Sequence, residues 1–368
     1  MKKKLLSILL AVTLIGTMTM ACAKNENENT DNKSEQQTES AADTTSSEDS
    51  NVASKGQLIV YSNTDQTGAD AMVAVGKEIG IDVNVVMLAG GGEVIDRLIA
   101  EKNSPIADVV YGINHIGFAR LKAQDLLQQF EPAWADQVEK GLKDPEGYYY
   151  GVGMSAILLA YMEEYIGSEI PTDWTQLWTK DAFKGKYFVD PRTSGGTTQL
   201  VLSGILSRYR DDQGEYGISD EGWQAIADYY KNAYIKQEGD DFFALLTKGQ
   251  ILMGQTYSGG VVKANADYEA DVKWAIPEIG VPFAVEMVGI VNGSKNTDLA
   301  KEFLDYYGSA EVMSKVSKSV PTIAEARENV DAEVRAIVDS VTVQEIDYDF
   351  VAQNLDRWLE KIELELIP

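Results

Sequence analysis

Apolar and polar stretches alternate three times in the early part of the chain. Residues 57–61 form an apolar run that ends in a polar loop, which is followed by a stretch typical of a helix. Residues 81–88 precede a glycine loop and the helical pattern at 94–99, and residues 107–111 precede a further helix that ends near Leu127. Strand, loop and helix in this order predict parallel βαβ units, with ligand-facing loops at the carboxyl ends of the strands.

The middle of the chain predicts longer elements. Residues 149–161 are mostly apolar and predict a strand that passes between two lobes, and residues 287–291 predict a return crossing. Between them the pattern predicts helices at 174–183, 200–209, 221–234 and 242–248, and strands at 187–189, 251–253 and 272–276. From Asp298 onward apolar residues recur at helical spacing, so we expect an α/β fold.

The N-terminal segment has the pattern of an export signal. Three lysines precede the mostly apolar residues 5–20, a run that is short for a membrane-spanning helix of about 20 residues. Ala21 directly before Cys22 resembles a bacterial lipobox, which predicts a signal peptide at 1–21 and a lipid on Cys22. An ordinary signal peptide that is cut near Ala21 or Ala23 is the alternative.

The next segment predicts a tether. Residues 23–55 are mostly Asn, Glu, Thr, Ser, Asp and Gln and contain no aromatic residue. Such a composition cannot bury enough apolar surface to offset the entropy of ordering, so we expect 22–55 to be a disordered acidic and polar linker. Together with the lipid, the linker predicts an exported protein that is anchored to the outer face of the cell membrane.

Composition and charge exclude several classes of protein. The chain has 32 Lys and Arg against 58 Asp and Glu, a formal charge of −26, so its general surface does not favour nucleic acid. One Cys and one His cannot supply a disulfide within the chain or a structural zinc site. With 368 residues and a 44% hydrophobic content, a soluble protein of two domains is expected.

The sequence contains none of the common catalytic motifs. Residues 90–95 lack the third glycine of a dinucleotide-binding loop, no Walker A motif is present, and residues 153–157 lack the last glycine of a nucleophile elbow. A Ser and His mechanism would have to recruit His115, the single imidazole, and no spacing supports it. We therefore expect no catalysis and no cofactor, although a secreted enzyme based on carboxylates or tyrosines stays open.

One loop is suited to a small anion. Residues 193–198 place hydroxyls and glycines at the start of an apolar helix, where unpaired backbone N–H groups carry roughly +0.5 of an elementary charge. Arg192 beside them adds a bidentate donor. The alternative is a well-capped helix that uses Thr193 or Ser194 as its N-cap and binds no ligand.

Two further loops resemble it. Residues 62–64 give a hydroxyl-rich loop after the first strand, and Gly90, Gly91 and Gly92 permit close approach of a ligand to the backbone before a helix. A plain tight turn is the competing interpretation of the triple glycine.

The order of these motifs resembles the extracellular solute-binding proteins of ABC importers, in the branch of ferric-iron, 2-aminoethylphosphonate, sugar-phosphate, thiamine and polyamine binders. The likeness covers about residues 57–320 and rests on five segments, at 58–62, 90–101, 107–111, 190–196 and 277–296. It implies an α/β two-lobed periplasmic-binding-protein fold of type II, with a ligand cleft between lobes joined by crossing strands. It also implies a monomer that captures a small solute and delivers it to a membrane permease with its ATPase.

The resemblance also implies domain limits. We expect the first lobe at 56–150 and about 285–320, the second lobe at 151–284, and C-terminal helices that pack on the lobes at 321–368. A structural surface lipoprotein without a ligand is a rival interpretation.

The ligand is expected to be an organophosphorus anion, a phosphonate or a sugar phosphate. Ferric-binding relatives hold iron through adjacent tyrosines, whereas this chain has only Tyr257 at the matching place, so iron(III) is the second choice and thiamine or a polyamine the third. His115 and Glu286 have structural alternatives, as a hydrogen-bonded surface histidine and a solvated charge. The expected ligand-binding residues are Ser62, Asn63, Thr64, Gly91, Gly92, Asn114, His115, Arg192, Ser194, Gly195, Gly196, Thr197, Tyr257 and Glu286, and no metal site is expected.

Overall fold

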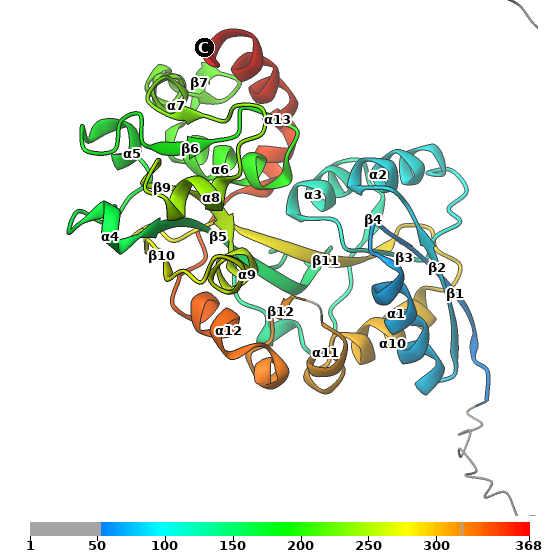
Figure 1. Cartoon of the computed structure of the whole chain (residues 1–368). Coiled ribbons are helices and arrows are strands. Elements are labelled where there is room, and N and C mark those ends of the chain that lie inside the picture. Colours follow the sequence, from blue (N-terminus) through cyan, green and yellow to red (C-terminus); the bar gives the residue numbers. More distant parts are fainter. Residues whose placement is uncertain (1–52, 318) are drawn as a thin grey trace, which may run out of the picture. The chain divides into compact units, whose positions relative to one another are not determined.

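A computed structural model describes residues 53–317 and 319–368 (Figure 1). One continuous path of paired strands runs through it. In spatial order the strands are β2 (Ile81–Met87), β1 (Gly56–Ser62), β3 (Val109–Tyr111), β11 (Phe283–Val291), β5 (Tyr150–Met162), β9 (Met253–Tyr257), β6 (Tyr187–Val189) and β8 (Tyr234–Ile235). Three short strands join at the side: β4 (Leu127–Gln128) pairs with β11, and β10 (Val272–Trp274) and β12 (Val320–Pro321) pair with β5.

Strand β5 divides this path into two sheets. Its first half, residues 150–156, pairs antiparallel with β11, and its second half, residues 157–161, pairs antiparallel with β9. The 13-residue strand is almost entirely apolar because it is buried along both halves. We call the sheet of β1 to β4, β11 and β12 the first lobe, and the sheet of β6, β8, β9 and β10 the second lobe; β5 belongs to both.

The helices follow the strands as the βαβ pattern requires. In the first lobe these are α1 (Gln66–Glu78), α2 (Gly91–Ala100), α3 (His115–Ala123), α10 (Thr297–Tyr307) and α11 (Ala310–Val316). In the second lobe they are α4 (Glu163–Ile166), α5 (Gln176–Thr179), α6 (Gly196–Leu206), α7 (Asp220–Lys231), α8 (Phe242–Thr247) and α9 (Ser258–Tyr268). Two C-terminal helices, α12 (Ala332–Asp339) and α13 (Tyr348–Lys361), complete the set.

Parallel pairing places the loops of the first lobe together. Strand β1 pairs in parallel with both β2 and β3, so the loops that follow these three strands lie at one edge of the sheet. The second lobe repeats the arrangement, because β6 pairs in parallel with β9 and β8. The two predicted crossings are present, with β11 beginning four residues earlier than expected at Phe283.

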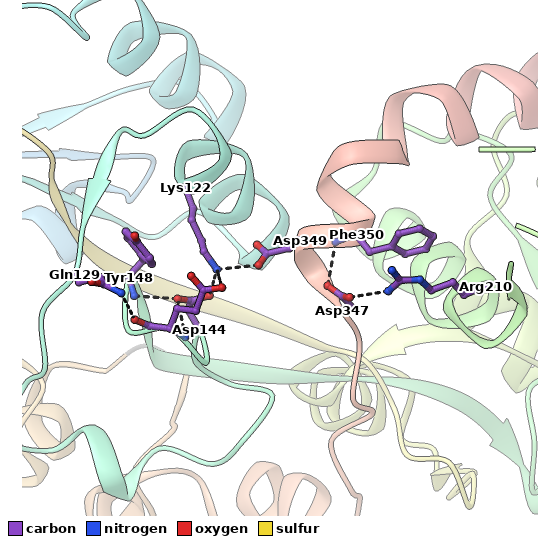
Figure 2. A network of polar contacts seen from close by, with 9 residues as sticks. Lys122, Gln129, Asp144, Tyr148, Arg210, Asp347, Asp349 and Phe350 are labelled. Atoms are coloured by element: carbon purple, nitrogen blue, oxygen red, sulfur yellow. Dashed lines mark hydrogen bonds and ion pairs between the residues drawn. The ribbon is translucent and has the colours of Figure 1, made fainter. Parts of the chain in front are cut away.

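Helix α13 connects the lobes a second time. Its buried face, with Val351, Leu355 and Trp358, packs into the core of the second lobe. Its first turn reaches the first lobe, where the ammonium of Lys122 on α3 lies 2.8 Å from both Asp144 and Asp349 (Figure 2). Burial opposes the charge of this ammonium, but its hydrogen bonds to Asp144 and Asp349 raise the pKa of Lys122 above its ordinary value. Since removing one partner would leave a buried charge uncompensated, this contact ties α13 to α3.

Some elements differ from the sequence pattern. The strand expected at 251–253 begins only at Met253 and runs to Tyr257, and a hairpin strand, β7 (Arg210–Glu215), interrupts the helical segments where none was predicted. Its exposed, charged residues lack the apolar alternation that marks a strand. Within the described residues no helix is long and apolar enough to cross a membrane. The predicted signal peptide, Cys22 and most of the linker lie outside the described residues.

Candidate ligand site

A cavity of about 390 Å³ lies at the carboxyl ends of β6 and β9 in the second lobe. It brings together six of the residues expected from the sequence, namely Arg192, Ser194, Gly195, Gly196, Thr197 and Tyr257. The other residues that line it are Phe188, Asp190, Thr198, Gln255 and Thr256. These residues come from segments more than 50 positions apart, which meet because β6 and β9 are parallel neighbours.

The start of helix α6 forms one wall of this cavity. Its N-cap is Gly195, whose backbone is extended and which has no side chain to accept a hydrogen bond, and its first turn contains no acidic residue. Apart from the adjacent residues and the backbone of the helix itself, no atom lies within 4 Å of the position that a Cβ of Gly196 would take, so the backbone there faces open space. The first N–H groups of α6 are therefore available to a ligand, and the helix dipole favours an anion.

The two hydroxyl side chains before α6 have different environments. Thr193 is buried and donates a hydrogen bond to Glu363 near the C-terminus, so its side chain is occupied within the protein. Ser194 is exposed beside the cavity and makes no cap to the helix. The alternative of a self-capped helix at Thr193 or Ser194 does not match this geometry.

Three charged side chains adjoin the cavity. Both Arg192 and Lys236 bond the carboxylate of Asp190, with Arg192 Nη2 at 2.6 Å and Lys236 Nζ at 3.0 Å. Hydrogen bonds from Arg192, joined by those from Lys236, hold the pKa of Asp190 well below its usual range. These three charges sum to +1, and the carboxylate of Glu363, which accepts the hydrogen bond from Thr193, offsets this charge next to the free helix N-terminus. Because 73% of the Arg192 side chain is exposed, part of its guanidinium is accessible to a ligand.

Tyr257 separates this cavity from a second one of about 350 Å³, and it lines both. The second cavity takes residues from both lobes, including Ser155 of β5 and Ser317 and Ser319 before β12. The start of helix α9 borders it through Gly259, and α9, like α6, has neither a side-chain cap nor an acidic residue in its first turn. Tyr257 itself is 49% exposed, an unusual state for a large aromatic residue at a helix start.

The predicted residues at the ends of β1 and β2 lie elsewhere. Ser62 is fully buried, and its Oγ accepts a hydrogen bond from the N–H of Thr64, while Asp65 caps helix α1. The Asn63 side chain lies against Gly112. At α2, Gly91 and Gly92 begin the helix, but the carboxylate of Glu93 accepts a hydrogen bond from the N–H of Ala89 and places a negative charge there. These residues do not line either cavity.

The side chains of Asn114 and His115 make hydrogen bonds within the first lobe. Asn114 caps helix α3 by accepting a hydrogen bond from the N–H of Gly117. His115 is 2% exposed, donates from Nε2 to the carbonyl of Gly141 at 2.9 Å, and stacks on Tyr348 with ring centroids 4.1 Å apart. Burial lowers the pKa of His115 to about 3. The histidine is thus neither at the surface nor at either cavity, but a neutral core residue between α3 and α13.

Glu286 lies on β11 behind the second cavity. Its carboxylate accepts a hydrogen bond from the hydroxyl of Tyr111 at 3.2 Å and lies close to Gly153 on β5. Burial raises the pKa of Glu286 above its usual value, an effect that the Tyr111 hydrogen bond partly opposes. It is therefore not a solvated charge, and it does not line either cavity.

Several residues at the site were not identified from the sequence. Lys236 directly follows β8, a two-residue strand too short to leave a pattern, and Asp190 was recognised only as part of a motif. Ser155 lies inside a long apolar strand, so its position in the sequence does not indicate a binding residue. Among the described residues no group of three or more His, Cys, Asp and Glu is arranged to hold a metal ion.

Residues 70–338 match the family described as bacterial extracellular solute-binding protein. The chain belongs to this family. One relative is the probable ABC transporter periplasmic-binding protein y4fP of Sinorhizobium fredii. It is 37% identical to this chain over 302 residues, which cover 81% of this chain and 82% of the relative. These matches confirm the resemblance inferred from the sequence. The present chain is therefore the substrate-binding component of an ABC importer.

Solved structures of the same fold bind different solutes. An iron- and citrate-bound protein of Trichodesmium superposes with a TM-score of 0.69 at 18% identity, over 84% of this chain and 98% of that one. The AfuA protein of Actinobacillus pleuropneumoniae with bound fructose-6-phosphate gives a TM-score of 0.58 at 18% identity, over 85% and 99%. These likenesses confirm the two-lobed fold of this solute-binding protein, and at such identity they do not identify its ligand.

Proposed function

We propose that this solute-binding protein captures a small organophosphorus anion, a phosphonate or a sugar phosphate, in the cavity at the start of α6. The observation that carries the proposal is the free N-terminus of α6. Among the helices of eight or more residues in the described part of the chain, only α6 and α9 begin with neither a side-chain cap nor an acidic residue in the first turn. Both of these helices border cavities that share Tyr257.

Local charge outweighs the charge of the whole protein at this place. The chain carries a formal charge of −26, which does not attract an anion from a distance. With a Debye length of about 8 Å at physiological ionic strength, however, a bound anion interacts mainly with its neighbours. Arg192 and Lys236 balance the carboxylates of Asp190 and Glu363, and the free N–H groups of α6 add the positive partial charge that favours an anion.

Iron(III) is the second candidate, favoured by the exposed phenol of Tyr257 at the cavity wall. A hard ferric ion prefers several anionic oxygen ligands. Among the described residues that line the 390 Å³ cavity, the only other anionic group is Asp190, and its oxygens are occupied by Arg192 and Lys236. A cation such as thiamine or a polyamine, the third candidate, would meet the guanidinium of Arg192 at the cavity wall.

Binding measurements with purified protein test the proposal. Calorimetry and thermal shift with 2-aminoethylphosphonate, fructose 6-phosphate, inorganic phosphate, Fe(III) citrate and putrescine should show binding by a phosphorus-containing compound. At a ligand concentration of 100 times Kd, linkage predicts a stabilisation of about 2.7 kcal/mol. If only Fe(III) or putrescine raises Tm, the anion assignment is wrong.

A double variant locates the site. Arg192→Ala with Ser194→Ala should weaken a phosphorus-containing ligand by roughly 100-fold, because a charge-assisted and a neutral hydrogen bond are lost. Arg208→Ala is the matched control, since this arginine also pairs with an aspartate of the second lobe, Asp173, but does not line the cavity. Equal affinities of the double variant and the wild type would remove Arg192 and Ser194 from the site.

We also propose how the protein is held and how it works with its permease. A lipid on Cys22 and the linker at 22–55 would keep the folded part at the outer face of the membrane, and closure of the lobes about β5 and β11 would present the loaded form to the permease. Cys22→Ala should release the protein from the membrane fraction of cells into the soluble fraction. Retention of the variant in the membrane fraction would contradict lipid anchoring.

A further inference from the structure

The second cavity, on the far side of Tyr257, has no role in the anion site as described above. Of its lining residues, Ser155, Ser314, Ser317 and Ser319 carry hydroxyls, Asn329 carries an amide, and Tyr257 contributes its phenol. Its volume of about 350 Å³ nearly equals that of the anion cavity, and both are within the range of small-molecule pockets, about 300–1,000 Å³. A lone phosphate group would leave this whole volume without a ligand.

The described polar groups that line the second cavity are neutral apart from one carboxylate. This carboxylate belongs to Asp331 and already accepts hydrogen bonds from the N–H groups of Glu333 and Val334 as the cap of α12. No lysine or arginine is among the described residues that line the cavity. Among the described lining residues, a second anionic group would therefore meet a carboxylate and no cation, and an ammonium group would meet a carboxylate that is already engaged.

The start of α9 adds hydrogen-bond donors to the same place. Tyr257 and Gly259 at this start both line the cavity, and α9 has no side-chain cap. Free N–H donors together with serine hydroxyl oxygens match the hydroxyl groups of a polyhydroxylated chain. The hydroxyls of Ser314 and Ser317 already donate to backbone carbonyls, so these two serines offer acceptors to a ligand.

We propose that the second cavity, lined by Ser155, Tyr257, Ser317 and Ser319, binds the hydroxylated carbon chain of a solute whose phosphate occupies the anion cavity at α6. The solute is then a phosphorylated sugar or polyol, and not an aminophosphonate or inorganic phosphate. This inference rests on the proposed function, because it assumes that the anion cavity holds the phosphate. It assigns Tyr257 to the junction between the two halves of the ligand, where its ring packs against the carbon chain.

The contribution of Ser155 is open to a direct test. Ser155 belongs to β5, where the strand passes from one lobe to the other, and it is the lining residue that β5 supplies. Ser155→Ala removes only the hydroxyl, and Ser155→Val additionally fills part of the cavity with a side chain that suits a strand. Ser207→Ala is the control, since it removes a serine hydroxyl that is buried and lies outside both cavities.

Calorimetry with purified wild-type protein and these variants tests whether the second cavity binds the hydroxylated chain. Among fructose 6-phosphate, glucose 6-phosphate and glycerol 3-phosphate, at least one should bind more than tenfold tighter than both 2-aminoethylphosphonate and inorganic phosphate. Ser155→Ala should lower this preference about fivefold, the effect of one hydrogen bond, and Ser155→Val should lower it further. Ser207→Ala should preserve it.

The outcomes separate this inference from the proposed function. Two outcomes would mean that the second cavity has been assigned wrongly while the anion site stands. In the first, 2-aminoethylphosphonate or inorganic phosphate binds with the same affinity as the hydroxylated phosphates. In the second, Ser155→Ala and Ser155→Val both keep the wild-type preference. If no phosphorus-containing compound binds to the wild type, the proposed function itself is wrong. Unphosphorylated fructose serves as a further control and should bind at least tenfold more weakly than its phosphate.

Discussion

Two helices of the second lobe, α6 and α9, begin differently from the helices that follow β1, β2 and β3 in the first lobe. Two other helix starts of the second lobe are capped, α7 by Ser219 and α8 by Asp241. In the first lobe, Asp65 and Asn114 cap α1 and α3, and Glu93 places a negative charge at the start of α2. In the second lobe, α6 and α9 begin with uncapped N–H groups and without an acidic residue. A capped terminus gains stability and loses its attraction for an anion, whereas an uncapped terminus keeps that attraction for a ligand. Under the proposed function, the second lobe supplies the anion site and the first lobe closes against it.

The largest expected effect comes from capping α6 artificially. Gly195→Asp places a carboxylate at the N-cap, where the backbone angles suit any residue and only Thr198 lies near the new Cβ, at 3.6 Å. The substitution should stabilise the helix by about 1 kcal/mol and yet weaken an organophosphorus anion by about 3 kcal/mol, roughly 100-fold, because the carboxylate occupies the N–H groups and repels the ligand.

Calorimetry and thermal denaturation of the same sample measure both effects. Gly195→Ala is the matched control, since it adds a Cβ without a hydrogen-bond acceptor and should retain most of the affinity. An unchanged affinity in Gly195→Asp would mean that the start of α6 does not hold the ligand, and the contrast between the lobes would lose its functional meaning.

The next effect concerns the single histidine. Because burial lowers the pKa of His115 to about 3 from an ordinary value near 6.5, the unfolded chain binds a proton between these pH values and the folded protein does not. This residue therefore makes the protein less stable as the pH falls from 6.5 to 3, by about 1.4 kcal/mol per unit, or about 2.7 kcal/mol at pH 4.5.

Urea denaturation of the wild type and of His115→Phe at pH 7 and 4.5 measures this contribution. Phenylalanine retains the stacking on Tyr348 but cannot be protonated, so the variant should lose less stability on acidification. The carboxylates titrate in both proteins and cancel in the comparison. Parallel pH profiles would show that His115 is accessible to solvent, which would reopen a role for it in ligand binding.

The smallest effect is expected at a first-lobe cap. Asn114→Ala removes the hydrogen bond to the N–H of Gly117 and should cost about 1 kcal/mol of unfolding free energy. Ligand affinity should remain within twofold of the wild type, because Asn114 lines neither cavity. A large loss of affinity with little loss of stability would instead bring the first-lobe loops into the site.

The sequence predicted the fold better than it predicted the site. The βαβ order and the crossing strand β5 follow from hydrophobic runs of the right length, which depend on local burial. The hairpin strand β7 could not be predicted because its residues, from Arg210 to Glu215, are exposed and charged. Lys236 could not be connected to Asp190 from the sequence, since only the parallel pairing of β6 and β8 brings them within 3.0 Å.

Similar loops also proved different in ways that local sequence does not reveal. Residues 62–64 and 193–197 both place hydroxyls between a strand and a helix, but the first group is turned inward, with Ser62 fully buried. In the second group Thr193 is engaged by Glu363, a residue 170 positions away, and Ser194 and Gly196 are left exposed. Whether a loop residue caps its own helix depends on neighbours that arrive from distant segments.

By itself the sequence determined the succession of strands and helices, the absence of the common catalytic motifs and the membership of a solute-binding family. Burial periodicity and motif order are properties of short segments, so they can be recognised without the tertiary structure. The tertiary structure alone decided which helix starts remain uncapped, where the positive charge gathers and that Tyr257 joins two cavities. These features arise from contacts between residues far apart in the chain, because both the occupancy of a donor and the charge around it depend on every segment that packs nearby.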